Sequence, residues 1–262
     1  MLSFLNKWWQ LFLQTVSPKY FYTISGAFIP WLGVIAGLLI SVGTVWGLAF
    51  APMDGVQGNS YRIIFVHVPA ASVALSGYFA LAVCAVISLV WKVKVAEMVA
   101  RAIAPLGAWF CFLALVTGGV WGKPTWGTYW VWDARLTSML ILLFLYVGVI
   151  ALYNAYESSA TGAKAAAILA IVGVVNLPII KYSVVWWNTL HQGATFTLTA
   201  KPKMPAEMWL PLVLMILGFY TLFALLTVLK TRTIILQRER RTQWVRDLVQ
   251  AQASIMESKN GL

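Results

Sequence analysis

Six long apolar runs limit what this sequence can fold into. They cover residues 28–50, 63–91, 102–122, 136–156, 165–187 and 208–229. Each reaches the roughly 20 residues that an α-helix needs to cross a hydrocarbon core of about 30 Å. Only 10% of the residues are charged, whereas a water-soluble globule carries about 25%. The sequence therefore predicts an all-α integral membrane protein with six transmembrane helices.

The basic residues predict which side of the membrane each connecting segment occupies. If the N-terminus is cytoplasmic, most of the 19 basic residues fall in cytoplasmic segments. The positive-inside rule then places both termini in the cytoplasm. The segments 51–62, about 121–137 and about 186–207 lie on the outer side in this arrangement. The net charge of +11 needs no nucleic acid to explain it, since basic segments beside anionic lipid are common.

The chain divides into three parts on the same pattern. Residues 1–27 are expected to form an interfacial N-terminal arm, with a short helix over 2–16. Residues 28–229 form the six-helix membrane domain, whose first run is too long for a cleavable signal peptide. Residues 230–262 alternate apolar and charged positions and predict a cytoplasmic amphipathic basic tail. This tail either lies on the anionic leaflet or docks a partner protein.

The outer segment of about 121–137, between the third and fourth runs, is unusually rich in tryptophan. It contains Trp121, Trp126, Gly127, Trp130, Trp132, Asp133 and Arg135. The aromatic belt at membrane interfaces accounts for isolated tryptophans. It does not call for a glycine turn or a carboxylate among them. Clustered indoles suit a flat apolar ligand whose polar rim stays in water, so we expect a platform for a planar molecule here.

The chain has two histidines, and the helix order brings both to the side of the tryptophan segment. His67 lies in the first turns of the second run, and His191 follows the fifth. Two neutral imidazoles beside a flat apolar platform suit the axial positions of a haem iron. A structural zinc site needs four ligands, and the sequence offers too few. Arg135 either pairs with Asp133 or faces an anionic group such as a haem propionate.

The cysteines argue against covalent attachment of that haem. Cys84 and Cys111 each lie in the middle of an apolar run, and the sequence has no Cys-x-x-Cys-His motif. We expect both to be packing residues. The sequence thus predicts a non-covalent haem, with His67 and His191 as ligands and the tryptophans as its platform.

The segment from Trp126 to Thr137, with the spacing W-G-x-x-W-x-W-D-x-R-L-T, resembles the WWD signature of haem-handling proteins in cytochrome c biogenesis. The six helices, the two histidines and the chain length resemble the CcmC branch of that family, the haem exporter protein C type. The likeness covers roughly residues 25–230. It implies that haem b is held at the periplasmic face of the bacterial inner membrane and passed to a CcmE-type haem chaperone. The implied partners also include a CcmA/CcmB-type ABC transporter and a small CcmD-type membrane protein.

Two other functions compete with a haem-transfer protein that is not itself an enzyme. A cytochrome b-type electron-transfer subunit normally binds haem through histidines in the middle of its helices, which this chain lacks. A channel or transporter would carry charged or polar residues at mid-membrane, and these runs carry few. Haem transfer therefore remains the leading hypothesis.

Overall fold

The computed structural model describes residues 17–187, 189–191 and 204–260, and these residues are almost entirely helical. Six helical segments are long and apolar enough to cross a membrane: 18–50, 59–91, 94–126, 134–154, 159–186 and 206–238. The six-helix prediction is therefore confirmed. No strand occurs in the described part of the chain, where Asp54 and Gly58 form an isolated bridge.

The helical elements follow one another with short connections. Helix α2 (Pro18–Val45) ends in a π-helical turn, η1 (Trp46–Phe50), and a 3₁₀ turn, η2 (Asn59–Ile63), leads into α3. The remaining elements are α3 (Ile64–Trp91), α4 (Lys94–Trp126), α5 (Ala134–Asn154), α6 (Ser159–Gly173), α7 (Asn176–Trp186), α8 (Ala206–Arg238) and α9 (Gln243–Asn260).

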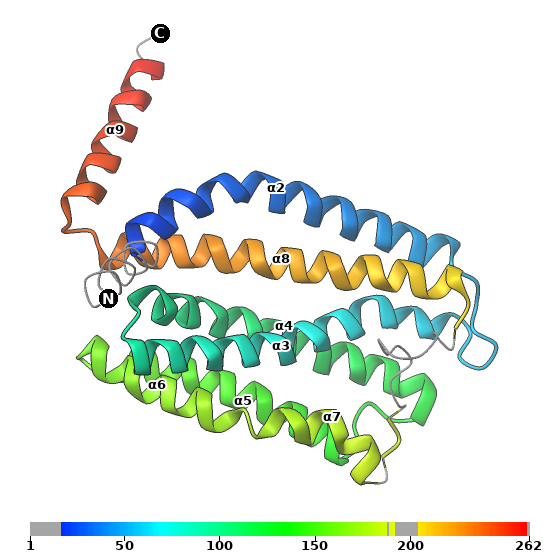
Figure 1. Cartoon of the computed structure of the whole chain (residues 1–262). Helices are drawn as coiled ribbons and strands as arrows, with labels where there is room; N and C mark the ends of the chain where they lie inside the picture. Colours follow the sequence, from blue (N-terminus) through cyan, green and yellow to red (C-terminus); the bar gives the residue numbers. More distant parts are fainter. Residues whose placement is uncertain (1–16, 188, 192–203, 261–262) are drawn as a thin grey trace, which may run out of the picture.

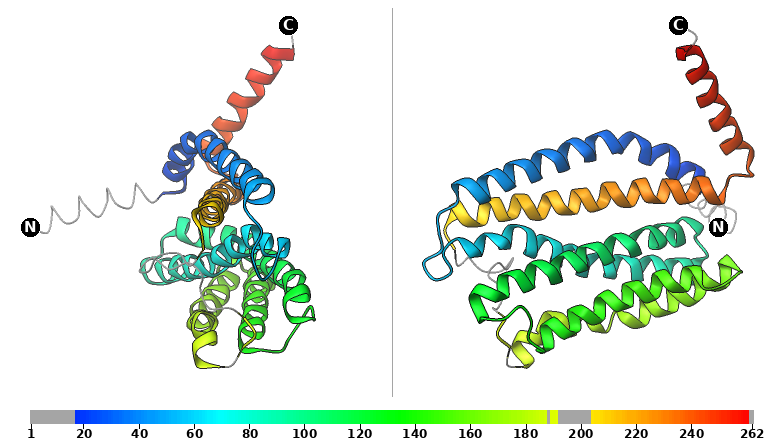
Figure 2. Two further views of the ribbon diagram at one scale, coloured as in Figure 1. Left: turned by 90° about the vertical axis from the view of Figure 1, so that its right-hand side faces the viewer. Right: turned by 180° about the vertical axis from the view of Figure 1, so that it is seen from behind.

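The spanning helices form three layers of roughly parallel axes. Figure 1 shows α2 lying along α8, the α3/α4 pair beneath them, and α5 with α6 and α7 on the far side. The view along the bundle in Figure 2 shows the same order. The central pair α3/α4 is in extensive contact and carries many small buried residues, including Ala70, Ala74, Ala104 and Ala114. Small side chains let membrane helices approach closely. Helix α2 stays largely exposed, as expected of a helix that faces lipid.

Several helices extend beyond the apolar runs that predict them. Helix α2 begins at Pro18, because the Ser17 Oγ accepts a hydrogen bond from the Tyr20 N–H and proline is tolerated in the first turn. Residues 18–27 are thus continuous with the first spanning helix. Helix α8 likewise continues past 229 to Arg238. The predicted interfacial helix over 2–16 lies outside the described residues.

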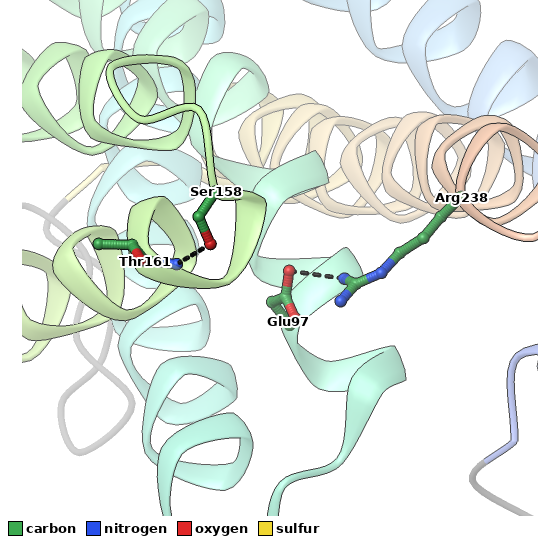
Figure 3. Close-up of polar contacts among 4 residues, drawn as sticks. All are labelled: Glu97, Ser158, Thr161 and Arg238. Carbon is green, nitrogen blue, oxygen red and sulfur yellow. Dashed lines mark hydrogen bonds and ion pairs between the residues drawn. The ribbon is translucent and has the colours of Figure 1, made fainter.

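One end of the bundle is tied together by arginines. Arg238 of α8 forms an ion pair of 2.6 Å with Glu97 of α4, and Ser158 caps α6 nearby (Figure 3). Arg232 donates a hydrogen bond to the Tyr22 carbonyl and lies over the Tyr22 ring. Helix α9 starts from this end and turns away from the bundle (Figure 1). The start of α2 and the end of α8 therefore lie together, as an even number of crossings requires.

The fifth crossing is interrupted between α6 and α7. The N–H groups of Val174 and Val175 bond to carbonyls three residues earlier, so one turn tightens before α7 begins. At the start of α7 the buried Asn176 donates a hydrogen bond of 2.8 Å to the Ser138 carbonyl of α5. Polar groups that a break frees inside a membrane must find partners on neighbouring helices. Asn176 thus fastens α7 to α5.

Candidate functional site

His67 lies one turn into α3 and is held by the last turns of α4. Its Nδ1 is 3.0 Å from the Ala114 carbonyl and 3.2 Å from the Thr117 Oγ1. The Thr117 hydroxyl donates its own proton to the Leu113 carbonyl at 2.6 Å, so both neighbours of Nδ1 act as acceptors. We therefore assign the ring proton to Nδ1. The Nε2 lone pair is then available to a metal, as in most ligating histidines.

Gly118 makes room for this ring. A Cβ at position 118 would lie 2.9 Å from the Cε1 and 3.3 Å from the Nδ1 of His67. A separation under 3.0 Å is one that packed carbon atoms do not tolerate without movement. The His67 position thus depends on the absence of a side chain at Gly118.

His191 comes from the other side, beyond the end of α7. Its backbone N–H donates to the Thr189 Oγ1 at 2.9 Å, which fixes the turn after the helix. The imidazole centroids of His67 and His191 are 6.3 Å apart, with 33° between the ring planes. Two imidazole nitrogens that bind one metal ion at about 2 Å each separate the ring centroids by about 6 Å. The distance between the two rings thus leaves room for one metal ion bound by both imidazoles.

Trp121 and Trp126 extend this pair into an aromatic cluster. The Trp121 ring meets His67 edge to face, with centroids 5.7 Å apart at 74°. The Trp126 ring lies 5.9 Å from that of His191 at 58°. Both tryptophans are half-buried on the last turns of α4, so the helix rather than a loop positions them. Each imidazole therefore has an indole beside it.

A cavity of about 310 Å³ opens between these side chains. Its wall is mostly apolar and comes from α3, α4, α5, α7 and α8. The lining residues are Ile64, His67, Val68, Ala71, Ser72, Leu75, Ala114, Leu115, Gly118, Gly119, Trp121, Gly122, Thr125, Trp126, Arg135, Leu136, Met139, Ile180, His191 and Leu212. An apolar cavity with a few convergent polar groups is the usual form of a cofactor site. We call the end of the bundle that carries it the cavity end.

The loop after α4 spans residues 127–133 and carries the other two tryptophans. Gly127 closes α4 at φ +80°, a left-handed conformation that favours glycine. The Trp130 and Trp132 rings pack together at 5.3 Å and 77°, so the two indoles share a face. Trp132 is 75% exposed, and neither ring lines the cavity. The structure thus does not bring all four predicted platform tryptophans together.

Asp133 and Arg135 have separate roles at the start of α5. The Asp133 Oδ1 accepts a hydrogen bond of 2.7 Å from the Leu136 N–H and caps the helix. Within the described parts of the chain, Asp133 and Arg135 form no ion pair. Arg135 instead lines the cavity. A guanidinium at a cavity wall can pair with an anionic group, so the second of the two alternatives from the sequence stays a prediction.

Buried polar atoms without partners remain in the loop. The Trp130 Nε1 and the Asp133 Oδ2 are buried and have no hydrogen-bond partner among the described residues. Buried polar atoms of this kind are uncommon in folded proteins. Both lie in the stretch that resembles the WWD signature.

Three residues of the site escaped the sequence analysis: Gln57, Thr117 and Gly118. Gln57 accepts a hydrogen bond from the Trp121 indole, Thr117 holds His67, and Gly118 leaves space for it. Thr117 and Gly118 stand one helical turn before Trp121, on the α4 face that meets His67. That helical spacing is the signal that could have found them; nothing in the sequence pattern marks Gln57.

The donor set narrows the kind of metal group that would fit. Across the residues that the structure describes, no three His, Cys, Asp or Glu side chains cluster as metal ligands. A structural zinc site is thus not formed there. Two imidazoles suffice for haem, because the porphyrin supplies the four equatorial nitrogens. The residues present fit haem iron better than a bare ion.

These features define a multi-pass membrane protein with an aromatic, two-histidine ligand cavity at one end of its bundle. The chain belongs to the CcmC family, described as heme exporter protein C, whose family model matches residues 11–246. It is 52% identical over 241 residues to heme exporter protein C of Escherichia coli K12, which covers 92% of this chain and 97% of that protein. The counterpart of Haemophilus influenzae is 50% identical over 242 residues, covering 92% of this chain and 98% of that protein. The counterpart of Bradyrhizobium diazoefficiens is 41% identical over 244 residues, covering 93% of this chain and 90% of that protein. Family membership and the six spanning helices make it a multi-pass protein of the inner membrane.

Proposed function

We propose that this protein binds haem b non-covalently at the cavity end and hands it to a periplasmic haem chaperone of the CcmE type. The coarser role, haem handling in cytochrome c maturation, follows from the family. The observation that carries the finer proposal is the pair His67 and His191, whose rings lie 6.3 Å apart beside a largely apolar cavity.

In this proposal each residue has a distinct task. His67 and His191 would hold the iron, and the Ala114 carbonyl, which accepts from Nδ1, leaves the Nε2 of His67 free to bind it. Trp121 and Trp126 pack against the imidazoles, and Arg135 holds a propionate through its guanidinium. Trp130 and Trp132 lie outside the cavity. We assign them to the exposed edge of the haem or to the chaperone that takes it.

The size of the cavity supports transfer rather than permanent storage. A volume of about 310 Å³ lies at the lower bound for cofactor pockets. A porphyrin with its side groups would therefore keep one edge outside the protein, where a chaperone could reach it. Cys111 is buried and Cys84 half-buried within the bundle, so we expect no thioether bond to haem. Acid–acetone should extract all haem from this polypeptide.

Partners follow from the same proposal. We infer an assembly with a CcmA/CcmB-type ABC transporter and a small CcmD-type membrane protein. The protein acts there as a binding and transfer component, not as an enzyme.

Replacing His67 or His191 by Ala tests the proposal directly. We expect each variant to accumulate in the membrane but to lose the low-spin haem spectrum and to block cytochrome c maturation. Spectra of the detergent-purified protein measure the first effect, and haem staining of c-type cytochromes measures the second. Full low-spin haem in the double variant would show that the ligand assignment is wrong. If the variants lost the low-spin spectrum but c-type cytochromes still matured normally, and the wild-type haem cycled between its ferric and ferrous forms, a cytochrome b-type subunit would be favoured instead.

A further inference from the structure

The indole of Trp121 links the proposed iron ligand His67 to a loop at the cavity end. Its Nε1–H donates a hydrogen bond of 2.8 Å to the Gln57 Oε1. The same ring meets His67 edge to face at 5.7 Å and 74°, and both rings line the cavity. Gln57 itself does not line the cavity. It therefore reaches the proposed ligand through one intervening ring.

Hydrogen bonds within the loop hold the backbone on both sides of Gln57. Asp54 Oδ1 accepts hydrogen bonds from the N–H groups of Val56 at 2.9 Å and Gln57 at 2.7 Å. Asp54 and Gly58 pair through both backbone groups at 3.0 and 3.2 Å. The Gln57 carbonyl accepts from the Ser60 hydroxyl at 2.7 Å and from its N–H at 3.2 Å. A residue held at both ends can present its side chain in one place at low entropic cost.

The loop is in turn fastened to the helices on either side of it. The Tyr61 hydroxyl donates to the Pro52 carbonyl at 2.7 Å. The Arg62 guanidinium donates to the carbonyl of Ala51 at 2.7 Å and to that of Leu48. These contacts tie the loop to the end of α2 and to the turn that leads into α3, in which Tyr61 and Arg62 lie six and five residues before His67. The loop that carries Gln57 is therefore anchored to the helix that carries the proposed ligand His67.

His67 needs a restraint of this kind. The bond from its Nδ1 to the Ala114 carbonyl sets the direction of the ring nitrogens, but it still permits rotation of the ring about that direction. The Trp121 ring packs against the imidazole in an edge-to-face contact and limits this rotation, provided the indole itself cannot turn. The hydrogen bond to Gln57 removes the freedom of the indole.

We propose that Gln57 is a positioning residue for His67, acting through Trp121. The proposal rests on the proposed function, because it takes His67 as a ligand of the haem iron. It assigns to the loop over residues 51–58 a part in setting the plane of one axial imidazole. The electronic structure of low-spin ferric haem depends on the angle between its two imidazole planes, so a change at Gln57 has a spectroscopic signature.

Gln57→Leu is the principal test, because it keeps the size of the side chain and removes the acceptor. We expect the variant to bind haem, with a broadened and shifted electron paramagnetic resonance spectrum of the low-spin ferric iron. We also expect haem to pass to apomyoglobin about tenfold faster, since loss of outer-shell support weakens metal sites by 10- to 100-fold. Gln57→Glu retains an oxygen acceptor, so its spectrum and its rate of haem transfer to apomyoglobin should both match those of the wild-type protein.

Trp121→Phe removes the donor of the same hydrogen bond, since it lacks the indole N–H but retains an aromatic ring. It should reproduce the Gln57→Leu spectrum. The double variant should be no worse than either single variant, because both changes remove one shared interaction. If Gln57→Leu does not accumulate in the membrane, Gln57→Ala takes its place, because it also removes the acceptor of the Trp121 bond and leaves the cavity wall unchanged.

Distinct results would overturn the two proposals. A wild-type protein that binds haem with two histidines, together with unchanged spectra and haem loss in both single variants, would show that Gln57 has no positioning role. Additive effects in the double variant would show that Gln57 and Trp121 act independently, which would also contradict the positioning role of Gln57. A wild-type protein that cannot be loaded with low-spin haem would instead refute the proposed function.

Discussion

The side chains around His67 illustrate how much of a ligand site is built from residues that never touch the ligand. The His67 Nδ1 is held by a backbone carbonyl of α4, and the ring packs against Gly118 and the edge of Trp121. None of these three is a metal ligand. Together they fix where the imidazole lies and which nitrogen is free, and such outer contacts raise the affinity of a ligand set.

Gly118→Ala should displace His67 without altering the ligand itself. The new Cβ would lie 2.9 Å from the His67 Cε1, and an overpacked site loses about 1–3 kcal/mol. If that cost falls on the haem-bound state, affinity drops roughly tenfold or more. Titration of the apoprotein with haem, followed by its absorption spectrum, measures the change.

The matched control for that substitution is Gly37→Ala. Gly37 also lies within a spanning helix, but a Cβ there meets nothing within 4 Å. Haem affinity should be unchanged in this variant. Equal losses in both variants would mean that glycine flexibility, and not the space beside His67, controls binding.

At the scale of the helices, the interrupted fifth crossing leads to His191, the second proposed ligand. Helix α7 leads to His191 and contributes Ile180 to the cavity. Asn176 at its start is bonded to α5, the helix that carries Arg135. The break thus comes directly before the helix that leads to His191, and the Asn176 bond fastens the start of that helix to α5.

Asn176→Leu should loosen this attachment. Hydrogen bonds between membrane helices are worth about 0.6 kcal/mol on average and up to roughly 1.7 kcal/mol. We therefore expect a stable protein in which a fraction of the haem becomes high-spin, because His191 no longer always reaches the iron. The ratio of high-spin to low-spin bands in the ferric spectrum measures this fraction.

Asn154→Leu is the comparison for that prediction. Asn154 lies at the opposite end of α5 and is exposed, where it accepts a hydrogen bond from Arg101. Its removal should leave the spin state unchanged. A fully low-spin Asn176→Leu protein would mean that α7 does not need this bond to hold His191 in place.

For the whole molecule, the layered bundle separates the cavity end from the end that carries α9. Thr128 follows α4 at one end, and Gln237 lies in the last turn of α8 at the other (Figure 1). Alkaline phosphatase is active only outside the cytoplasm. Fused at Thr128 it should be active, and fused at Gln237 it should be inactive. Equal activity at both positions would contradict the six crossings, and the reverse pattern of activity would contradict the cytoplasmic termini expected from the positive-inside rule.

The sequence alone determined the class of the fold and singled out the two histidines as candidate site residues. Six apolar runs permit few structures other than spanning helices, because a lipid core leaves no alternative partner for the backbone. His67 and His191 were found because the chain has no other histidine and because helix order brings both to one side. The tryptophan-rich segment was equally visible, as its composition exceeds what an aromatic belt explains.

Only the tertiary structure decided how those parts meet. The sequence expected four tryptophans on one loop, whereas α4 continues to Trp126 and carries two of them beside the imidazoles. An apolar run predicts which residues lie in the lipid core, but it does not predict where the helix ends. Helical turns that project beyond the run are therefore missed. Gln57, Thr117, Gly118 and Asn176 act through contacts between helices far apart in sequence. Such contacts follow from how the helices pack against one another, and no local pattern of residues encodes them.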